Sequence, residues 1–360
     1  LAAVSKAIKE LEASGDQEKA TVVRDTLNHK SVAAALKVLT TGDTPGGAAP
    51  SRVTLPVVGA AGYVTLSNWE RMSEAERRQV LCEPGGTSRY NDQGDNESIE
   101  WAKWSWNPVT GCRHNCSYCY ARDIAERFYP QKFEPTLHPD RLSAPQNTPF
   151  PESKVAKEFG YRNVFVCSMA DLFGRWVPRE WIEAVLKAVR DAPRWNFLFL
   201  TKFPGRMAEF EFPDNAWVGT SVDVQARVKK AEEAFRQIQA KVKWLSVEPM
   251  LEPLKFEDLG AFDWLVLGGA SQSTQTPEWH PPRSWVNALE EQARQLGIPI
   301  YEKKNLLSRI RGYPGAPAQE PLQAPAELRY LSGTGPTAPG ADDRQAPPDG
   351  PAEGGATEGS

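Results

Sequence analysis

The sequence predicts an α/β fold in which six or seven parallel strands form a partial (βα) barrel. Short apolar runs alternate with helical stretches through residues 98–312 of the 360-residue chain. The runs are apolar at almost every position, which is typical of parallel strands covered on both faces. Most runs end in polar or small residues, as strands do where a parallel sheet opens onto a site. We therefore expect one barrel domain with shorter flanking segments.

Seven strand candidates follow one another, separated by helical stretches. The strand candidates are Ser105–Thr110, Asn163–Ser168, Asn196–Thr201, Ala216–Ser221, Val242–Val247, Asp263–Gly268 and Ile298–Tyr301. The helical stretches are Arg179–Arg190, Val224–Ala240 and Ser284–Leu296. Repeated strand–helix units of this length predict a parallel sheet, and fewer than eight units predict an incomplete barrel.

The flanking segments differ from the barrel in composition. Residues 1–39 show two helical patterns, which predict either a helical hairpin or the remnant of a helix-turn-helix. Residues 40–97 form a predicted linker that contains one helix over 67–82. Residues 313–360 are rich in Pro, Gly and Ala and carry seven acidic and two basic residues, which predicts a disordered acidic tail. The net charge of −4 therefore belongs to the tail, and the nearly neutral body neither favours nor excludes nucleic acid.

The composition also bears on the compartment. No apolar run is long enough to span a membrane, and no secretory signal is visible at the first residues. The chain begins with Leu rather than Met, so it could be a fragment. Its five cysteines are too few and too clustered for a disulfide framework, which favours a reducing, cytoplasmic location.

The most informative segment is a cysteine loop, residues 111–121, which directly follows the first strand candidate. Cys112, Cys116 and Cys119 have the spacing C-x3-C-x2-C. Three thiolates can hold three irons of a [4Fe–4S] cluster and leave the fourth iron open. A zinc site that adds His114 or His138 is the alternative. Because the loop follows a strand, we expect it to open onto the mouth formed by the other strand ends.

The loop resembles the signature of the radical S-adenosylmethionine (SAM) superfamily, with Tyr118 directly before the last cysteine. This resemblance implies a [4Fe–4S] cluster and SAM as cofactors, with SAM chelating the open iron. Reduction of the cluster then cleaves SAM, and the resulting 5′-deoxyadenosyl radical abstracts hydrogen from a substrate. The resemblance also implies an electron donor such as flavodoxin or ferredoxin.

Further segments, over roughly residues 98–305, resemble an uncharacterised phage-associated family of three-cysteine proteins. They include Ile99-Glu-Trp, Trp106-Asn-Pro-Val-Thr-Gly-Cys, Leu200-Thr-Lys and Leu245-Ser-Val-Glu-Pro-Met. Two departures are the short gap between the first two cysteines and Gly268-Gly-Ala-Ser271, where the family often has Gly-Gly-Glu-Ser. A shorter likeness, in Asn107-Pro and Cys119-Tyr-Ala-Arg, links the loop to the spore-photoproduct-lyase-like branch, which repairs DNA. A nucleic acid or nucleotide is therefore the preferred substrate class.

By analogy with the radical SAM superfamily, several strand ends are predicted to contact SAM. Ser168 and Asp171 match the position that meets the SAM amino group, and Ser221 and Asp223 match the position that meets the ribose. Each aspartate could instead cap a following turn or helix. The remaining candidates are Gly268 and Gly269, for close backbone approach or a tight turn, and Tyr118, for adenine contact or packing.

Charged residues at the ends of buried strands are the candidates for substrate chemistry. Lys202 and Glu248 each follow an apolar run, where a charge is costly unless it is paired or faces a cavity. We expect both to face the mouth, and an ion pair between them is the alternative. Lys303 and Lys304, with Arg309 and Arg311, are expected on a solvated helix face or in phosphate contact.

The sequence thus favours a radical SAM enzyme of unknown substrate. The first alternative is a non-enzymatic phage protein that binds zinc or an iron–sulfur cluster and nucleic acid. The second alternative is a DNA-binding regulator that acts through residues 1–39.

Overall fold

The computed structural model of the chain describes residues 62–82, 86–94, 99–155, 158–273 and 276–306, together with the single residues 310, 312 and 314. The helices expected over 1–39, and the tail expected over 313–360 apart from Pro314, lie outside the described residues. The chain divides into two compact units between Tyr63 and Val64. The fold below is that of the second unit.

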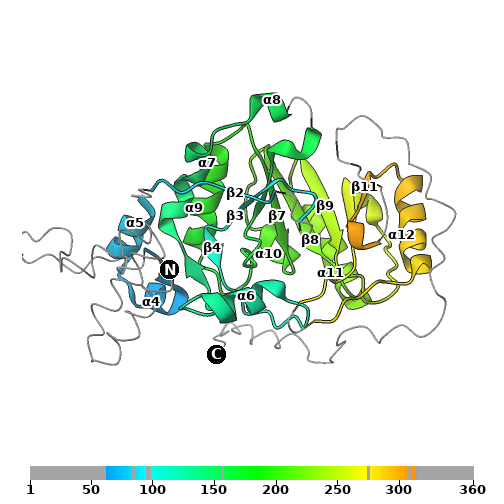
Figure 1. The fold of residues 1–360 in the computed structure, drawn as a ribbon, viewed down its shortest axis with the longest axis horizontal. Helices are drawn as coiled ribbons and strands as arrows, with labels where there is room; N and C mark the ends of the chain where they lie inside the picture. The colour runs from blue at the N-terminus through cyan, green and yellow to red at the C-terminus, as the bar shows by residue number, and fades with distance from the viewer. Residues whose placement is uncertain are drawn as a thin grey trace, which may run out of the picture. The chain divides into compact units, whose positions relative to one another are not determined.

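An eight-stranded sheet forms the centre of this unit, in the order β11-β10-β9-β8-β7-β6-β3-β2 (Figure 1). Its strands are β2 Asn91–Asp92, β3 Trp104–Trp106, β6 Asn163–Val166, β7 Asn196–Thr201, β8 Ala216–Ser221, β9 Val242–Val247, β10 Trp264–Leu267 and β11 Ile300–Glu302. All neighbours from β3 to β11 are parallel, and only β2 is antiparallel to its partner. Successive parallel strands lie side by side, as in a barrel, but the edge strands β2 and β11 do not pair in the described part of the chain. The predicted parallel α/β sheet is confirmed, and the barrel is open.

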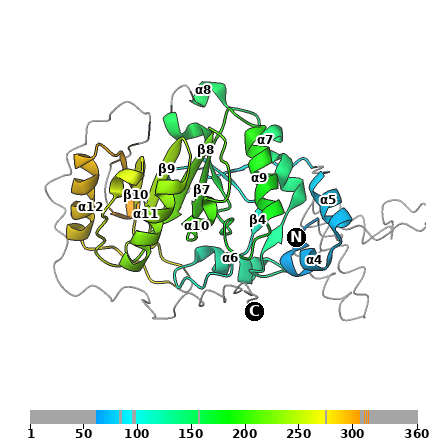
Figure 2. The ribbon, with the colours of Figure 1, turned by 180° about the vertical axis from the view of Figure 1, so that it is seen from behind.

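Helices between the strands cover the outside of the sheet (Figures 1 and 2). The α-helices are α4 Leu66–Arg71, α5 Glu74–Cys82, α6 Tyr120–Phe128, α7 Ala144–Asn147, α8 Glu152–Val155, α9 Arg179–Arg190, α10 Pro204–Met207, α11 Val228–Gln237 and α12 Arg283–Gln295. The 3-10 helices are η1 Pro139–Ser143, η2 Phe159–Arg162, η3 Gln225–Arg227, η4 Leu259–Ala261 and η5 Lys304–Leu306. The predicted helix over 224–240 is shorter than expected, because its first turn is the 3-10 helix η3.

The first strand candidate, Ser105–Thr110, is corrected by the structure. It splits into β3 and β4 (Val109–Thr110), which belong to different sheets. Pro108 lies between them and has no N–H to donate to a continuous ladder. β4 instead joins an antiparallel sheet, in the order β1-β5-β4, with β1 Val64–Thr65 and β5 Thr136–Leu137.

The single helix predicted over 67–82 is wrong, because the segment forms α4 and α5. Ser73 and Glu76 make a reciprocal cap that starts α5: the Ser73 N–H donates to the Glu76 carboxylate at 2.7 Å, and the Glu76 N–H donates to Ser73 Oγ at 3.4 Å. The predicted linker also packs on the barrel unit, since Trp69 of α4 lies edge-on to Trp181 of α9 at 5.5 Å between ring centroids.

Tryptophan rings fill the inside of the open barrel. Trp101, Trp217, Trp244 and Trp264 belong to one buried cluster, and Trp244 and Trp264 are fully buried. Ring centroids of Trp244 and Trp264 are 5.3 Å apart. This layer closes the inside of the sheet below the strand ends, so the space above it is left for a site.

Substitution of Gly219 by Ala is expected to strain this layer. A Cβ at Gly219 of β8 would lie 2.3 Å from Cε2 of the buried Trp244 indole. Because the indole has no free volume into which to move, Gly219→Ala should lower the free energy of unfolding by about 1–3 kcal/mol. Urea unfolding measures this change. Gly205→Ala is the control, since a Cβ there meets nothing within 4 Å, and equal costs for the two variants would contradict the packing described.

A buried acid pair at the β11 edge predicts a pH-dependent stability. Glu302 and Glu290 are almost fully buried, and both contact Arg283, at 2.8 Å and 2.6 Å. Burial and then the neighbouring Glu290 raise the pKa of Glu302 above its ordinary value of 4.5. The folded state therefore keeps a proton that the unfolded state releases, so stability falls as the pH rises above that value.

Glu302→Gln should flatten this dependence, because the amide stays neutral at every pH. Between pH 5 and pH 9 the wild type should lose at least about 1.4 kcal/mol more than the variant, which corresponds to one pKa unit. Denaturant unfolding across this range checks the prediction, and parallel curves for the two proteins would contradict it.

Candidate functional site

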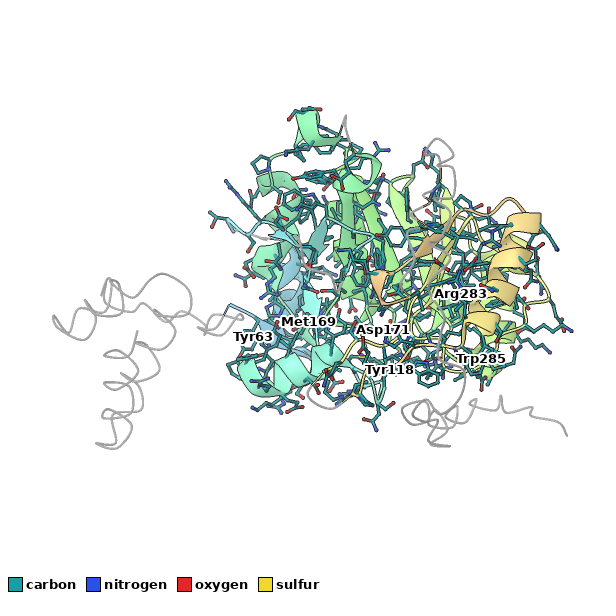
Figure 3. All side chains as sticks on the ribbon, turned by 45° about the vertical axis from the view of Figure 1, so that its right-hand side comes forward. Tyr63, Tyr118, Met169, Asp171, Arg283 and Trp285 are labelled. Atoms are coloured by element: carbon teal, nitrogen blue, oxygen red, sulfur yellow. The ribbon has the colours of Figure 1, made fainter. Side chains whose placement is uncertain are left out.

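A cavity of about 470 Å³ opens at the carboxyl ends of the parallel strands. Side chains from β6, β7, β8 and β9, from the cysteine loop and from α6 line it. Figure 3 shows Tyr118, Met169 and Asp171 at the lower end of the sheet, where these strands end. The cavity therefore occupies the place where parallel α/β folds build their sites.

The cysteine loop is held against this cavity by backbone hydrogen bonds. Gly111 N donates to Met169 O at 2.9 Å, and Cys112 N donates to Phe133 O at 3.1 Å. Gly111 has a φ of +83°, and a Cβ there would lie 2.1 Å from Glu134 O. Only glycine therefore fits this turn, which directs the chain from β4 into the cysteines. The loop ends where Cys119 directly precedes α6.

The three cysteines of the loop share one environment. Cys112, Cys116 and Cys119 are half-buried, form no disulfide and all line the cavity. Burial raises the pKa of the Cys112 thiol, and Asp171, Cys116 and Cys119 raise it further. Burial also raises the pKa of Cys119. A bound metal would favour the thiolate form of such thiols, because its positive charge stabilises the sulfur anion directly.

This donor set fits three corners of an iron–sulfur cluster. Within the described residues, no three His, Cys, Asp or Glu side chains come together as a single metal ion requires. A [4Fe–4S] cluster does not need such convergence, because each thiolate binds a different iron. Three free thiols on one loop, facing one cavity, are the donors that such a cluster takes.

Both histidines of the zinc alternative have one ring nitrogen in a hydrogen bond. His114 Nε2 lies 3.0 Å from Asp171 Oδ2, and His138 Nε2 lies 2.9 Å from Thr110 Oγ1. Burial lowers the pKa of His138 to about 3, so this ring stays neutral within its hydrogen bond. His114 lines the cavity with the three cysteines, whereas His138 does not. A zinc site with His114 as fourth ligand stays the alternative, because a zinc-bound histidine commonly gives its second ring nitrogen to a carboxylate.

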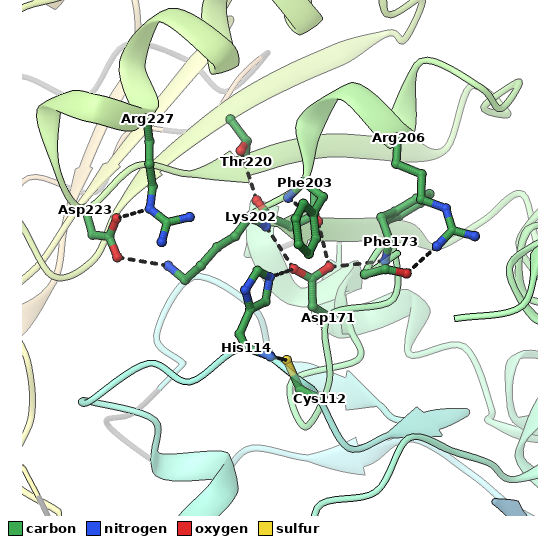
Figure 4. Close-up of polar contacts among 12 residues, drawn as sticks. Cys112, His114, Asp171, Phe173, Lys202, Phe203, Arg206, Thr220, Asp223 and Arg227 are labelled. Atoms are coloured by element: carbon green, nitrogen blue, oxygen red, sulfur yellow. Dashed lines mark hydrogen bonds and ion pairs between the residues drawn. The ribbon is translucent and has the colours of Figure 1, made fainter. Parts of the chain in front are cut away.

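Asp171 joins the cysteine loop to the end of β7 (Figure 4). Its carboxylate lies 3.0 Å from the His114 ring and accepts from Thr201 Oγ1 at 2.6 Å, from Phe173 N at 3.2 Å and from Lys202 N at 2.9 Å. Burial opposes its ionisation, but the hydrogen bond with His114 and the other contacts outweigh burial and lower the pKa of Asp171. All four acceptor positions are used, so contact with a SAM ammonium, which stays a prediction, would replace one of them.

Lys202 belongs to a second buried network. Its ammonium lies 2.8 Å from the Tyr118 hydroxyl and 3.4 Å from Asp223, and Tyr118 donates to the same carboxylate. Arg227 contacts the other oxygen of Asp223 at 2.7 Å (Figure 4). Burial opposes ionisation of Asp223, but Lys202 and then Arg227 outweigh it and hold the pKa near 2. Tyr118, Lys202 and Asp223 thus form one unit that links the cysteine loop to β7 and β8.

Glu248 pairs with a lysine that the sequence prediction placed elsewhere. Lys303 Nζ lies 3.1 Å from Glu248, and Trp101 Nε1 donates to the same carboxylate at 3.2 Å. The alternative of a Lys202–Glu248 ion pair is therefore wrong. The placement of Lys303 on a solvated helix face is also wrong, because it is 7% exposed and lines the cavity. Lys304 is exposed in η5, and Arg309 and Arg311 lie outside the described residues.

The other predicted residues line the same cavity, except for Asp223 and Gly268. Ser168, Ser221 and Gly269 line it. Gly268 lies behind the ion pair, where a Cβ would be 3.0 Å from both Glu248 Cγ and Lys303 Cδ. The structure thus brings most of the predicted residues together at one mouth, with Asp223 behind Lys202, and their individual roles stay predictions.

One group of cavity residues was missed by sequence reasoning. Tyr120, Ile124 and Phe128 of α6 line the cavity and are 42%, 39% and 67% exposed. The adjacent face of α6 buries Ala121 and Ala125 against Phe133 and Met169. The signal was present as an apolar residue at every fourth position after Cys119, which places all three on one helix face.

The fold and the site together define an α/β protein with a cysteine-lined cavity at the ends of its parallel strands. Residues 96–306 match the family described as "Protein of unknown function (DUF5131)", and the chain belongs to this family. No curated protein matches the chain.

Solved structures show distant similarity. A point mutant of spore photoproduct lyase is 10% identical with a TM-score of 0.39, covering 64% of this chain and 85% of its own. A double mutant of spore photoproduct lyase with bound AdoMet and dinucleoside spore photoproduct is 12% identical with a TM-score of 0.35. The match covers 64% of this chain and 85% of the lyase chain. A radical SAM methyltransferase from Sphaerobacter thermophilus is 11% identical with a TM-score of 0.34. The match covers 53% of this chain and 63% of the methyltransferase chain. Similarity at this level carries no argument about function.

No helix in the described part of the chain combines the length and the apolar character needed to cross a membrane.

Proposed function

We propose that the protein is a radical SAM enzyme that holds a [4Fe–4S] cluster on Cys112, Cys116 and Cys119. One observation carries the proposal: three free thiols with C-x3-C-x2-C spacing line a single cavity at the carboxyl ends of parallel strands. When bound, such a cluster supplies an open iron for SAM and the electron that cleaves SAM to a hydrogen-abstracting radical.

The residues of the chain position the ligands around that centre. Ser168 and Asp171 are the proposed contacts of the SAM amino group, and Ser221, Asp223 and Tyr118 the proposed contacts of its nucleoside. The Tyr118–Lys202–Asp223 unit fixes these side chains from three elements, so they are in place before SAM binds. Gly269 is a proposed backbone contact of SAM, although the space that a Cβ would take there is filled by Trp279 O at 2.2 Å. Gly268 leaves room for the Glu248–Lys303 pair.

The cavity interior suits an uncharged reacting group. Asp171, Lys202 and Glu248 each have a partner of opposite charge or a histidine within 3.4 Å. Apolar walls come from Trp101, Phe165 and Leu200 among others. A substrate would therefore place a neutral, partly apolar portion in the cavity, with Lys202 and Glu248 beside it. A nucleic acid or nucleotide, entering by its base, is the substrate class that we propose.

SAM cleavage tests the proposal directly. The protein is reconstituted anaerobically with iron and sulfide, reduced with dithionite, and assayed for 5′-deoxyadenosine with and without candidate oligonucleotides. The wild type should form 5′-deoxyadenosine, and Cys116→Ala should form none above background. A colourless wild-type protein that carries one zinc per chain and leaves SAM intact would support the non-enzymatic binding protein instead.

A further inference from the structure

A second hollow reaches the cysteine loop from another side. This outer hollow has a volume of about 500 Å³ and lies between the loop, α6 and the segment that leads to β5. It shares Cys112 and Phe133 with the cavity described above. Cys112 is therefore accessible from two directions, the strand-end mouth and the outer hollow.

The rim of the outer hollow carries more positive than negative charge. Arg113, Arg122 and Lys132 contribute three cations, and Glu126 and Glu134 contribute two carboxylates. The Glu134 carboxylate is turned toward α4, where it accepts from Ser67 N at 2.9 Å and from Ser67 Oγ.

Two of the three cations of the hollow, Arg122 and Lys132, are held in place. Lys132 Nζ donates to Glu126 O at 2.9 Å, and Arg122 donates to His114 O while its guanidinium carbon lies 5.0 Å from the centroid of the Phe133 ring. Arg113 and Lys132 are both exposed. Exposed cations around a concave surface attract an acidic partner and steer its approach.

The two directions of access suit two different tasks. A SAM molecule and a substrate would fill the strand-end mouth, so an electron donor needs another approach to the same centre. The outer hollow gives that approach, because Cys112 lies within it and a cysteine thiolate is bonded directly to iron in such clusters.

We infer that the outer hollow is the docking surface of an acidic one-electron carrier protein. This inference rests on the proposed function. The carrier loses one electron, the oxidised cluster gains it, and no bond or proton is exchanged. The positive rim sets the preference for an acidic carrier, and Cys112 is the thiolate nearest to the docked protein.

Two probes test this surface, an acidic bacterial flavodoxin and an acidic [2Fe–2S] ferredoxin. The first measurement is equilibrium binding of each carrier to the reconstituted protein at low and high salt. The second is the rate at which each reduced carrier, or dithionite, bleaches the visible absorbance of the cluster. The test variant is Arg113→Glu/Lys132→Glu, and the charge-matched control is Lys229→Glu/Lys230→Glu on the exposed face of α11.

The double variant at the hollow should bind a carrier about tenfold or more weakly, and be reduced by it correspondingly more slowly. Its reduction by dithionite should stay within about twofold of the wild type, because a small anion needs no docking surface. Wild-type binding should weaken as salt rises. The control variant should behave as the wild type.

Three outcomes would overturn the inference. The wild type could bind neither carrier, or the double variant at the hollow could bind a carrier as tightly as the wild type does. The third outcome is that reduction of the double variant is slowed equally with a carrier and with dithionite. The proposed function fails separately. A protein that binds and accepts electrons from a carrier but never cleaves SAM refutes the radical SAM proposal and leaves the docking surface intact.

Discussion

Cys116→Ala is expected to abolish the iron–sulfur cluster. The wild type should hold about four irons and four sulfides per chain after anaerobic reconstitution. With one of three thiolates removed, the cluster keeps only two protein ligands, and the loop between Cys112 and Cys119 offers no other thiol. Iron and sulfide analysis, together with the visible absorbance, should show well under half of the wild-type content.

The matched control for this prediction is Cys82→Ala, which removes an exposed thiol of α5 outside the cavity. It should keep the full cluster content. A Cys116→Ala protein with four irons per chain would show that the ligand assignment is wrong. Equal losses in Cys116→Ala and Cys82→Ala would show that the loss reflects general damage to the protein.

Lys202→Met should have the largest effect on stability. The lysine side chain is 12% exposed, and its ammonium balances the charge of the buried Asp223. Because Asp223 is buried, water cannot solvate its carboxylate in place of the lysine. Removing one partner of a buried ion pair costs about 3–5 kcal/mol in the free energy of unfolding, and we expect the lower end of this range, about 3 kcal/mol. The remaining contact of Asp223 with Arg227 limits the loss.

Urea unfolding of Lys202→Met and of Lys187→Met compares a buried lysine with an exposed one. Lys187 on α9 also pairs with an aspartate, at 2.6 Å, but its side chain is 71% exposed. Exposed pairs of this kind contribute about 0.5 kcal/mol or less. Similar destabilisation of the two variants would contradict the buried Tyr118–Lys202–Asp223 unit.

The sequence pattern located the regular parts of the fold well. Strands β7, β8 and β9 and helix α9 begin and end at the residues expected from apolar runs and helical spacing. The three strands are buried over nearly all of their length and α9 buries one face, so continuous apolar runs and helical spacing mark their bounds. The prediction of the first strand was wrong, because the apolar pattern does not show where a chain leaves one sheet for another. Here the chain changes sheets at Pro108.

The candidate site was predicted as a set, whereas the pairing within it was not. Strand order follows chain order, so residues at the strand ends meet at one mouth. The partner of each charge depends on how far neighbouring strands are displaced and on side-chain direction. Lys202 therefore pairs with Asp223, and Lys303 takes the place beside Glu248. Lys303 follows an apolar run just as Lys202 does, and this similarity in the sequence could have placed Lys303 at the mouth.

The open iron is the central claim, and electron paramagnetic resonance tests it most directly. The reconstituted wild-type protein is reduced with dithionite, and the spectrum of its reduced cluster is recorded before and after SAM is added. SAM bound at an iron without a protein thiolate should change the g-values of the signal. 5′-Deoxyadenosine, which lacks the amino and carboxylate groups of SAM that would chelate the iron, should leave them unchanged. A [4Fe–4S] signal that SAM leaves unchanged, or a protein without any cluster signal, would contradict the account.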